Sequence, residues 1–96
     1  MQYSSMHEWR NKSGTADRES PSGSWKDYWI EHSGRSWPSK CSVRGCNNPA
    51  TIGAHVYSRD AYGEYIVPMC DSCNHRTGSF MIEFGTEFVS ANTYKV

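Results

Sequence analysis

The sequence predicts a small α+β domain stabilised by zinc, and three observations support this class. The chain has 96 residues, of which 36% are hydrophobic and none is leucine, so an apolar core alone would be only marginally stable. All four cysteines fall within residues 41–73, as two close pairs. Between the pairs, apolar and polar residues alternate in short runs, which is typical of a β-hairpin.

The N-terminal segment, residues 1–23, does not show a structural period. It is rich in serine, glycine and charged residues, a composition that cannot bury enough apolar surface to offset the entropy of ordering the chain. We therefore expect a mostly disordered segment there, followed by a single zinc-binding domain at residues 24–96.

Residues 24–33 carry the signals of a short helix. Ser24 is a good N-cap residue, Asp27 follows three residues later as in a capping box, and Gly34 is suited to end the helix. One face of the helix carries Trp25, Tyr28, Trp29 and His32. We expect this aromatic face to pack on the zinc module. The alternative is an exposed platform for a base or a methyl-ammonium group, or for a protein partner through the two tryptophans.

A β-hairpin is predicted over residues 50–58 and 64–70. In the first strand, alternate positions form a small apolar stripe of Ile52, Ala54 and Val56. His55 therefore lies on the opposite face. In the return strand, Pro68 has no backbone N–H to donate, so we expect this strand to be an edge strand or to end there.

The segment after the hairpin is predicted to begin with a helix. Asp71 falls in its first turn, where the helix dipole favours an acidic residue, and Gly78 is suited to end it. Residues 86–91 are predicted to form one further short strand.

The cysteines have the spacing of a metal site. Cys41 and Cys46 form a C-x4-C pair, and Cys70 and Cys73 form a C-x2-C pair. Two chelating pairs predict one structural Zn²⁺ bound by four thiolates, and Gly45 suits a tight turn before the second sulfur. Two alternatives remain open, which are a pair of disulfides and a redox-active C-x2-C. The redox motif usually lies in a thioredoxin-like βαβ unit, which this sequence does not indicate.

The charge distribution gives a limited indication of partners. The formal net charge is zero, so no global field attracts nucleic acid or membrane. Arg35, Lys40 and Arg44 form a local basic run without an acid, which is either a set of phosphate contacts or a solvated surface. No apolar run is long enough to span a membrane and no signal peptide is visible. We therefore expect a cytoplasmic protein with no membrane partner and with reduced thiols.

The motifs resemble a known family. The sequence Cys41-x4-Cys46, then Ala54-His55-Val56, then Glu64-Tyr65-Ile66-Val67-Pro68-Met69-Cys70-Asp71-Ser72-Cys73-Asn74 resembles the zinc-stapled HNH endonucleases. The resemblance covers about a third of the chain. It implies a treble-clef fold, in which a zinc knuckle, a β-hairpin and a helix follow one another.

The resemblance also implies a second, hydrolytic metal site. In this family a histidine at the end of the first hairpin strand acts as general base, and a helix residue binds the Mg²⁺ or Mn²⁺ that polarises the phosphate. By this resemblance His55 is the general base and Asn74 the metal ligand, with His75 as an alternative ligand. A carboxylate ligand could come from Asp60 or Glu64.

Two departures from the family pattern decide the predicted function. Ala54 stands where the family has its first catalytic metal ligand, and Tyr65 stands near its middle asparagine. His55 then has an alternative role as a structural histidine bonded to Tyr57 or Tyr65. We therefore predict a zinc-binding HNH-like module without hydrolytic activity that binds DNA, RNA or a protein. The alternatives are a divergent HNH-type endonuclease that uses His55 and Asn74, and a zinc-stapled protein-interaction domain.

Overall fold

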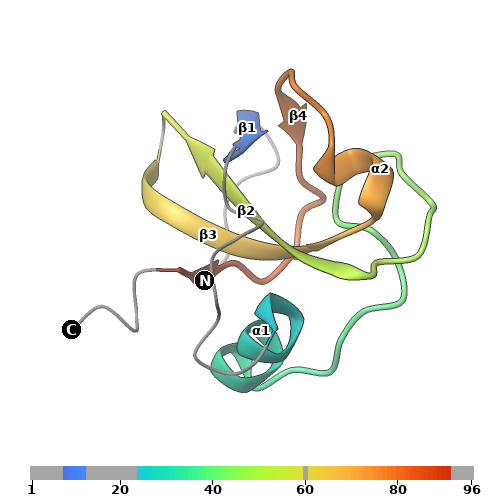
Figure 1. Cartoon of the computed structure of the whole chain (residues 1–96), viewed down its shortest axis with the longest axis vertical. Coiled ribbons are helices and arrows are strands. Elements are labelled where there is room, and N and C mark those ends of the chain that lie inside the picture. The colour runs from blue at the N-terminus through green and yellow to red at the C-terminus, as the bar shows by residue number, and fades with distance from the viewer. Residues whose placement is uncertain (1–7, 13–23, 60, 92–96) are drawn as a thin grey trace.

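The computed structural model describes residues 8–12, 24–59 and 61–91, and it has the predicted α+β class. Its elements are β1 (Glu8–Asn11), α1 (Trp25–Ser33), β2 (Ile52–Ser58), β3 (Ala61–Met69), α2 (Asp71–Asn74), β4 (Phe80–Met81) and β5 (Val89–Ser90). The strands form one antiparallel sheet in the order β4-β1-β2-β3-β5. Figure 1 shows α1 on one side of the β2–β3 hairpin, with α2 and β4 on the other.

The predicted hairpin is confirmed and forms the centre of the sheet. Strands β2 and β3 are paired along their length, with His55 opposite Ile66. Of the two alternatives expected from Pro68, the edge strand is wrong, because β3 lies between β2 and β5, whereas β3 does end close to Pro68, at Met69. Strand β5 pairs with Tyr65 and Ile66. Pro68 lies beyond that pairing, so its missing N–H removes no hydrogen bond to β5.

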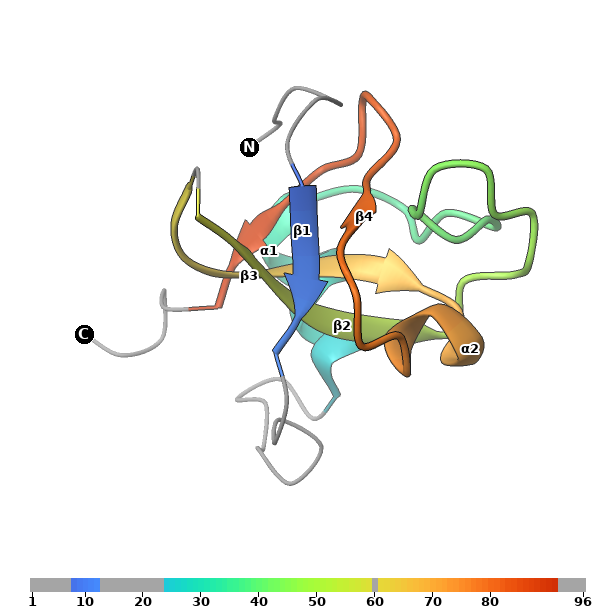
Figure 2. The same ribbon diagram turned by 90° about the horizontal axis from the view of Figure 1, so that it is seen from above.

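Strand β1 lies within the segment of residues 1–23 that was expected to be mostly disordered. Glu8–Asn11 pair with both β2 and β4, and Figure 2 shows β1 beside β4, with α1 on the far side of the hairpin. Trp9 is fully buried, and its ring centroid lies 4.6 Å from that of Phe88. One large aromatic ring thus supplies much of the apolar contact that holds this short strand in the sheet. The sheet therefore begins before the predicted boundary at residue 24, whereas most of the N-terminal segment lies outside the described residues.

Helix α1 has the predicted caps, and its aromatic face packs on the sheet as expected, but on the face opposite the cysteines and with His32 exposed. The Ser24 hydroxyl accepts a hydrogen bond of 3.0 Å from the N–H of Asp27, and Gly34 ends the helix with a left-handed φ of 68°. Tyr28 and Trp29 are both buried. They pack on Ile66 of β3, on Val89 of β5 and on Ala91, which follows β5 directly.

The sheet separates two apolar clusters. Tyr28 and Trp29 of α1 belong to the cluster on one face. The cluster on the other face contains Trp9, Val56, Tyr65, Val67, Phe88 and three of the four cysteines. Alternation along β2 directs Ala54 and Val56 toward the cysteine face and His55 toward α1.

The last described part of the chain differs from the prediction in detail. Helix α2 ends at Asn74, well before Gly78, because the chain then turns back to place β4 beside β1. The predicted strand at residues 86–91 is confirmed as β5, while the two-residue β4 was not predicted. Among the described residues, no helix is both long and apolar enough to cross a membrane.

Candidate metal centre

The four cysteine sulfurs converge at one point, on the sheet face opposite α1. Their Sγ atoms all lie within 4.8 Å of one another. Cys41 and Cys46 come from the loop between α1 and β2, Cys70 follows β3, and Cys73 lies in α2. Cys46 is half-buried and the other three are buried. The predicted grouping of the two cysteine pairs is therefore confirmed.

Backbone hydrogen bonds fold residues 41–46 into a compact loop. The N–H of Cys46 donates to the carbonyl of Val43 at 3.0 Å, and the N–H of Cys41 donates to the carbonyl of Asn48 at 2.9 Å. Gly45 has a φ of 81°, in the left-handed region that side chains disfavour. This explains why glycine stands directly before the second sulfur of the pair.

The same loop is attached to the sheet at two places. The N–H of Ser42 donates to the carbonyl of Pro68 at 3.0 Å, and the N–H of Arg44 donates to the carbonyl of Met81 at 2.9 Å. The first contact uses the end of β3 and the second uses β4. Strand β4, although short, therefore connects the loop that carries Cys41 and Cys46 to the rest of the sheet.

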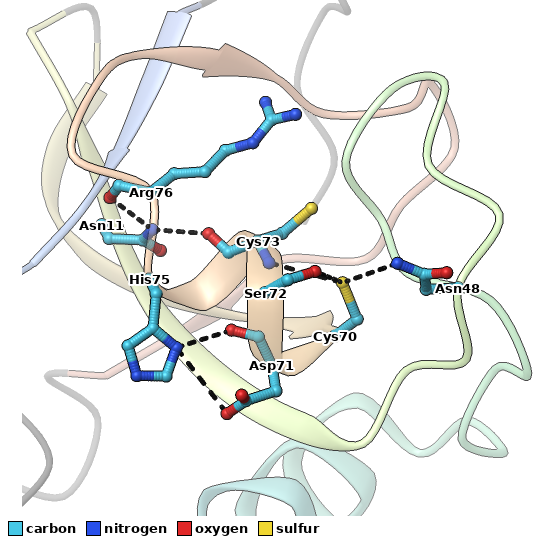
Figure 3. A network of polar contacts seen from close by, with 8 residues as sticks. All are labelled: Asn11, Asn48, Cys70, Asp71, Ser72, Cys73, His75 and Arg76. Atoms are coloured by element: carbon cyan, nitrogen blue, oxygen red, sulfur yellow. Dashed lines mark hydrogen bonds and ion pairs between the residues drawn. The ribbon is translucent and has the colours of Figure 1, made fainter.

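The second cysteine pair is organised by α2 and by Asn11 of β1. Cys70 is the N-cap residue of α2, and its sulfur accepts a hydrogen bond of 3.4 Å from the N–H of Cys73. The Asn11 side-chain amide donates to the carbonyls of Cys73 and Arg76, at 2.8 and 3.1 Å (Figure 3). Asn11 was not predicted as part of the site. The sequence shows only that polar and apolar residues alternate at Glu8-Trp9-Arg10, a pattern typical of a strand just before Asn11.

The geometry fits a four-thiolate zinc site. The Sγ atoms of Cys46 and Cys70 are 3.7 Å apart. A regular tetrahedron with Zn–S bonds of about 2.3 Å has sulfur–sulfur edges of about 3.8 Å. Bonded disulfide sulfurs would be only about 2.05 Å apart, and all four cysteines are free thiols. An all-sulfur donor set suits Zn²⁺ better than a hard cation.

Hydrogen bonds to Cys70 favour its thiolate. Burial raises its pKa, but hydrogen bonds from the Ser72 hydroxyl, the Cys73 N–H and the side chains of Cys73 and Cys46 together lower it more, so the pKa of Cys70 falls to about 6. Ser72 Oγ lies 3.5 Å and Asn48 Nδ2 3.8 Å from this sulfur. Burial raises the pKa of Cys41 and of Cys73. A zinc ion held by the four sulfurs would deprotonate these two thiols as well.

His55, the proposed general base, lies on the face covered by α1. Its side chain is 4% exposed, and its ring stands edge-on to the indole of Trp25 with the centroids 4.4 Å apart. A general base must reach the water from which it removes a proton. The position of His55 beneath Trp25 does not provide that access.

The residues proposed for a second metal do not form a ligand set with His55. Among the described residues, the four cysteines are the only set of three or more His, Cys, Asp and Glu side chains that could bind a metal ion. Asn74 is half-buried at the end of α2, and its N–H donates to the carbonyl of Cys70. His75 is exposed, with Nδ1 2.8 Å from the carbonyl oxygen of Asp71. Asp60 lies outside the described residues.

The two residues that depart from the HNH pattern are core residues. Ala54 and Tyr65 are both buried in the cluster that contains the cysteines. The Tyr65 hydroxyl donates to the carbonyl of Tyr62 at 2.9 Å. The Tyr65 side chain therefore lies on the sheet face opposite to the His55 ring, which argues against a hydrogen bond between the two side chains.

The three basic residues of the predicted phosphate contacts lie at two separate hollows. Arg35 and Lys40 line a hollow of about 320 Å³ beside residues 83–87, where the Arg35 guanidinium pairs with Glu87 at 3.4 Å. Arg44 lines another hollow, of about 500 Å³, beside the cysteines. The three side chains therefore do not form one surface.

Comparison with known proteins does not identify a relative. No protein-family model, no curated protein and no solved structure matches this chain. Its function is therefore inferred from the cysteine centre and the side chains around it.

Proposed function

We propose that this chain is a zinc-binding module of HNH-like, treble-clef type that binds nucleic acid without hydrolysing it. The convergence of the four cysteine sulfurs carries the zinc assignment. The order of the elements supports the treble-clef comparison, because a cysteine loop, the β2–β3 hairpin and a helix that opens at a cysteine follow one another. Four sulfur ligands would close the coordination sphere, so this zinc would act on the fold and not on a substrate.

The absence of hydrolytic activity is supported by the position of His55. This residue is buried beneath Trp25, and its neighbours Ala54 and Val56 face the cysteine side of the sheet. A metallonuclease needs a base, a metal and a phosphate at one accessible site. The described residues offer no second ligand set near this histidine.

Binding of a protein through the aromatic helix is less well supported. Trp29 is 3% exposed and its indole N–H donates to the carbonyl of Glu87 at 2.9 Å. Trp25 is half-buried against His55. The helix thus uses its aromatic face for its own core, which leaves charged groups as the better contacts for a partner.

The zinc assignment is tested by metal content and by cobalt substitution. The full chain is expected to bind one zinc per molecule, and Co²⁺ in its place should give the sulfur-to-cobalt charge-transfer bands of a tetrahedral four-thiolate site. Cys46→Ser should lose the zinc and most of the fold, since structural zinc energy is largely folding energy. A native circular dichroism spectrum with excess chelator would contradict the proposal.

Catalysis is tested with the zinc-loaded protein and either Mg²⁺ or Mn²⁺. We expect no cleavage of single- or double-stranded DNA or RNA, and no NMR shift at His55 or Asn74 as these cations are added. Metal-dependent cleavage that His55→Ala abolishes while the zinc stays bound would establish the divergent endonuclease instead.

A further inference from the structure

A polar hollow of about 500 Å³ lies beside the cysteine centre, between the 44–48 loop and α2. Its walls carry two arginines, Arg44 from the loop and Arg76 from the segment after α2, together with Asn47, Asn48 and Ser72. The described residues that line it include no Asp or Glu. Sequence proximity does not connect Arg44 with Arg76, because 31 intervening residues separate them.

The two guanidinium groups have no acidic partner in the described part of the chain. Arg35 is neutralised by Glu87 at 3.4 Å, but no ion pair joins Arg44 or Arg76 to a carboxylate of the described residues. Both side chains are exposed. Their positive charges are therefore available to an anion from solution.

The backbones of both arginines are held by the sheet. The N–H of Arg44 donates to Met81 of β4, and the carbonyl of Arg76 accepts from Asn11 of β1. Figure 3 shows the Arg76 side chain extending past Cys73 on the side of its sulfur. Because β1 and β4 are paired with each other, the distance between the two arginine backbones is fixed by the sheet.

We propose that this hollow binds a backbone phosphate of single-stranded nucleic acid. Guanidinium groups match phosphate oxygens with paired, charge-assisted hydrogen bonds, and the amide of Asn47 adds a neutral donor of the kind common in backbone contacts. This inference rests on the proposed nucleic-acid binding and identifies the surface that contacts the nucleic acid. With two cations and zero net charge, the binding is weak, and its salt dependence is modest because only one or two phosphates are contacted.

The zinc centre supplies a competing explanation for the same arginines. A zinc ion with four thiolates carries a formal charge of −2, and Arg44 and Arg76 could serve only to offset it. The hydroxyl of Ser72 and the amide of Asn48 already contact Cys70. The two explanations differ in what the removal of the arginines changes, which is nucleic-acid affinity in one and zinc affinity in the other.

The experiment uses the zinc-loaded full chain and two probes, which are inorganic phosphate and a fluorescent single strand of about 20 nucleotides of mixed sequence, as DNA and as RNA. The test variant is Arg44→Gln/Arg76→Gln. The control variant, Lys26→Gln/Arg59→Gln, removes two positive charges from exposed residues elsewhere. We expect the test variant to bind at least about tenfold more weakly at low salt. The slope of log affinity against log salt should fall by about 0.7 for each phosphate that the variant no longer binds. The control variant should bind the oligonucleotide almost as well as the unmodified chain, and neither variant should change the zinc affinity appreciably.

Four other outcomes would overturn the proposal in distinguishable ways. Equal reductions of affinity in test and control variants would leave nucleic-acid binding in place but refute this hollow. Weaker zinc binding without weaker oligonucleotide binding would assign the arginines to the metal centre. Binding of inorganic phosphate but not of the oligonucleotide would make free phosphate the ligand. No binding of either probe by the unmodified chain would refute nucleic-acid binding itself, while the zinc module would stand on its metal content.

Discussion

The side-chain amide of Asn11 donates a hydrogen bond of 2.8 Å to the backbone carbonyl of Cys73. The two residues are 62 positions apart, and the bond joins β1 to α2, which contains Cys73 and is capped by Cys70. The same amide reaches the carbonyl of Arg76 at 3.1 Å. One side chain thus supports the metal centre and the edge of the adjacent hollow.

Asn11→Ala is expected to lower the free energy of unfolding by about 1–3 kcal/mol, because it removes the two side-chain hydrogen bonds that join β1 to the carbonyls of Cys73 and Arg76. Zinc affinity should fall with it, since metal binding and folding are linked. Denaturant unfolding and a chelator competition measure the two effects. Lys12→Ala is the control, because it changes the next residue but keeps the backbone bond from Lys12 to His55. Equal effects of the two substitutions would refute this role of Asn11.

Gly53→Ala should destabilise the fold because α1 approaches β2 closely at this point. An added Cβ would lie 2.5 Å from the carbonyl carbon of Trp25 and 2.7 Å from the backbone nitrogen of Lys26. Backbone atoms cannot rotate away, so the helix must shift, at a cost of about 1–3 kcal/mol. Gly78→Ala is the matched control, since its Cβ would meet nothing within 4 Å. Thermal unfolding compares the two, and a Gly53→Ala protein as stable as the control would contradict the packing.

Trp29→Ala should destabilise the fold by about 3–5 kcal/mol, because it removes a large buried side chain. Trp29 packs edge-on against Trp37 with centroids 5.4 Å apart and is hydrogen-bonded to Glu87. Tyr62→Ala, at a position that is 95% exposed, should change stability by less than about 0.5 kcal/mol. Chemical denaturation measures both. Similar values for the two variants would mean that α1 is not part of the core.

Zinc binding to the folded metal-free state should release fewer than four protons at about pH 7.4, and a stabilising osmolyte is used to populate that state because removal of zinc otherwise unfolds most of the chain. The pKa of Cys70 is about 6 in the metal-free protein, so this group is already a thiolate, while Cys41 and Cys73 remain thiols. The depressed pKa of Cys70 also contributes stability to the metal-free fold. That contribution is present above pH 9.0, its ordinary pKa, and is lost as the pH falls through about 6.

Calorimetry in buffers of different ionisation enthalpy counts the released protons. As the pH falls below about 6, Cys70 also becomes protonated, and the proton count should rise by about one. In the same pH range, the slope of log zinc affinity against pH should increase by about one. A full count from all four cysteines already at neutral pH would show that Cys70 is an ordinary thiol.

The parts of the fold that were predicted correctly depend on local sequence. Ser24 and Gly34 lie within one turn of the ends of α1, so a short window contains the information that places the helix. The cysteine spacing is likewise information contained in a short stretch of sequence. A pair of cysteines can chelate one ion when the chain between them is short, and this constraint is visible in the sequence itself.

The missed elements depend on contacts between distant segments. Strand β4 has two residues, too few for any periodic pattern, and β1 is held by Trp9 against Phe88 near the other end of the described chain. Asn11 and Arg76 gain their positions only through these pairings. A sequence window could show that Trp9 is flanked by charges, but not which apolar residues would cover it.

The strand order constrains how a newly made chain can acquire this structure on the ribosome. Among the described elements β1 emerges first, yet its partner β2 follows only after α1, and its partner β4 follows only after all four cysteines. Until Phe80 and Phe88 are synthesised, Trp9 lacks the surroundings that bury it. The segment from Cys41 to Cys73 contains its own hairpin and all the zinc ligands, so it can close around the metal before β1 is incorporated. The metal centre would then be the template on which β1 is captured.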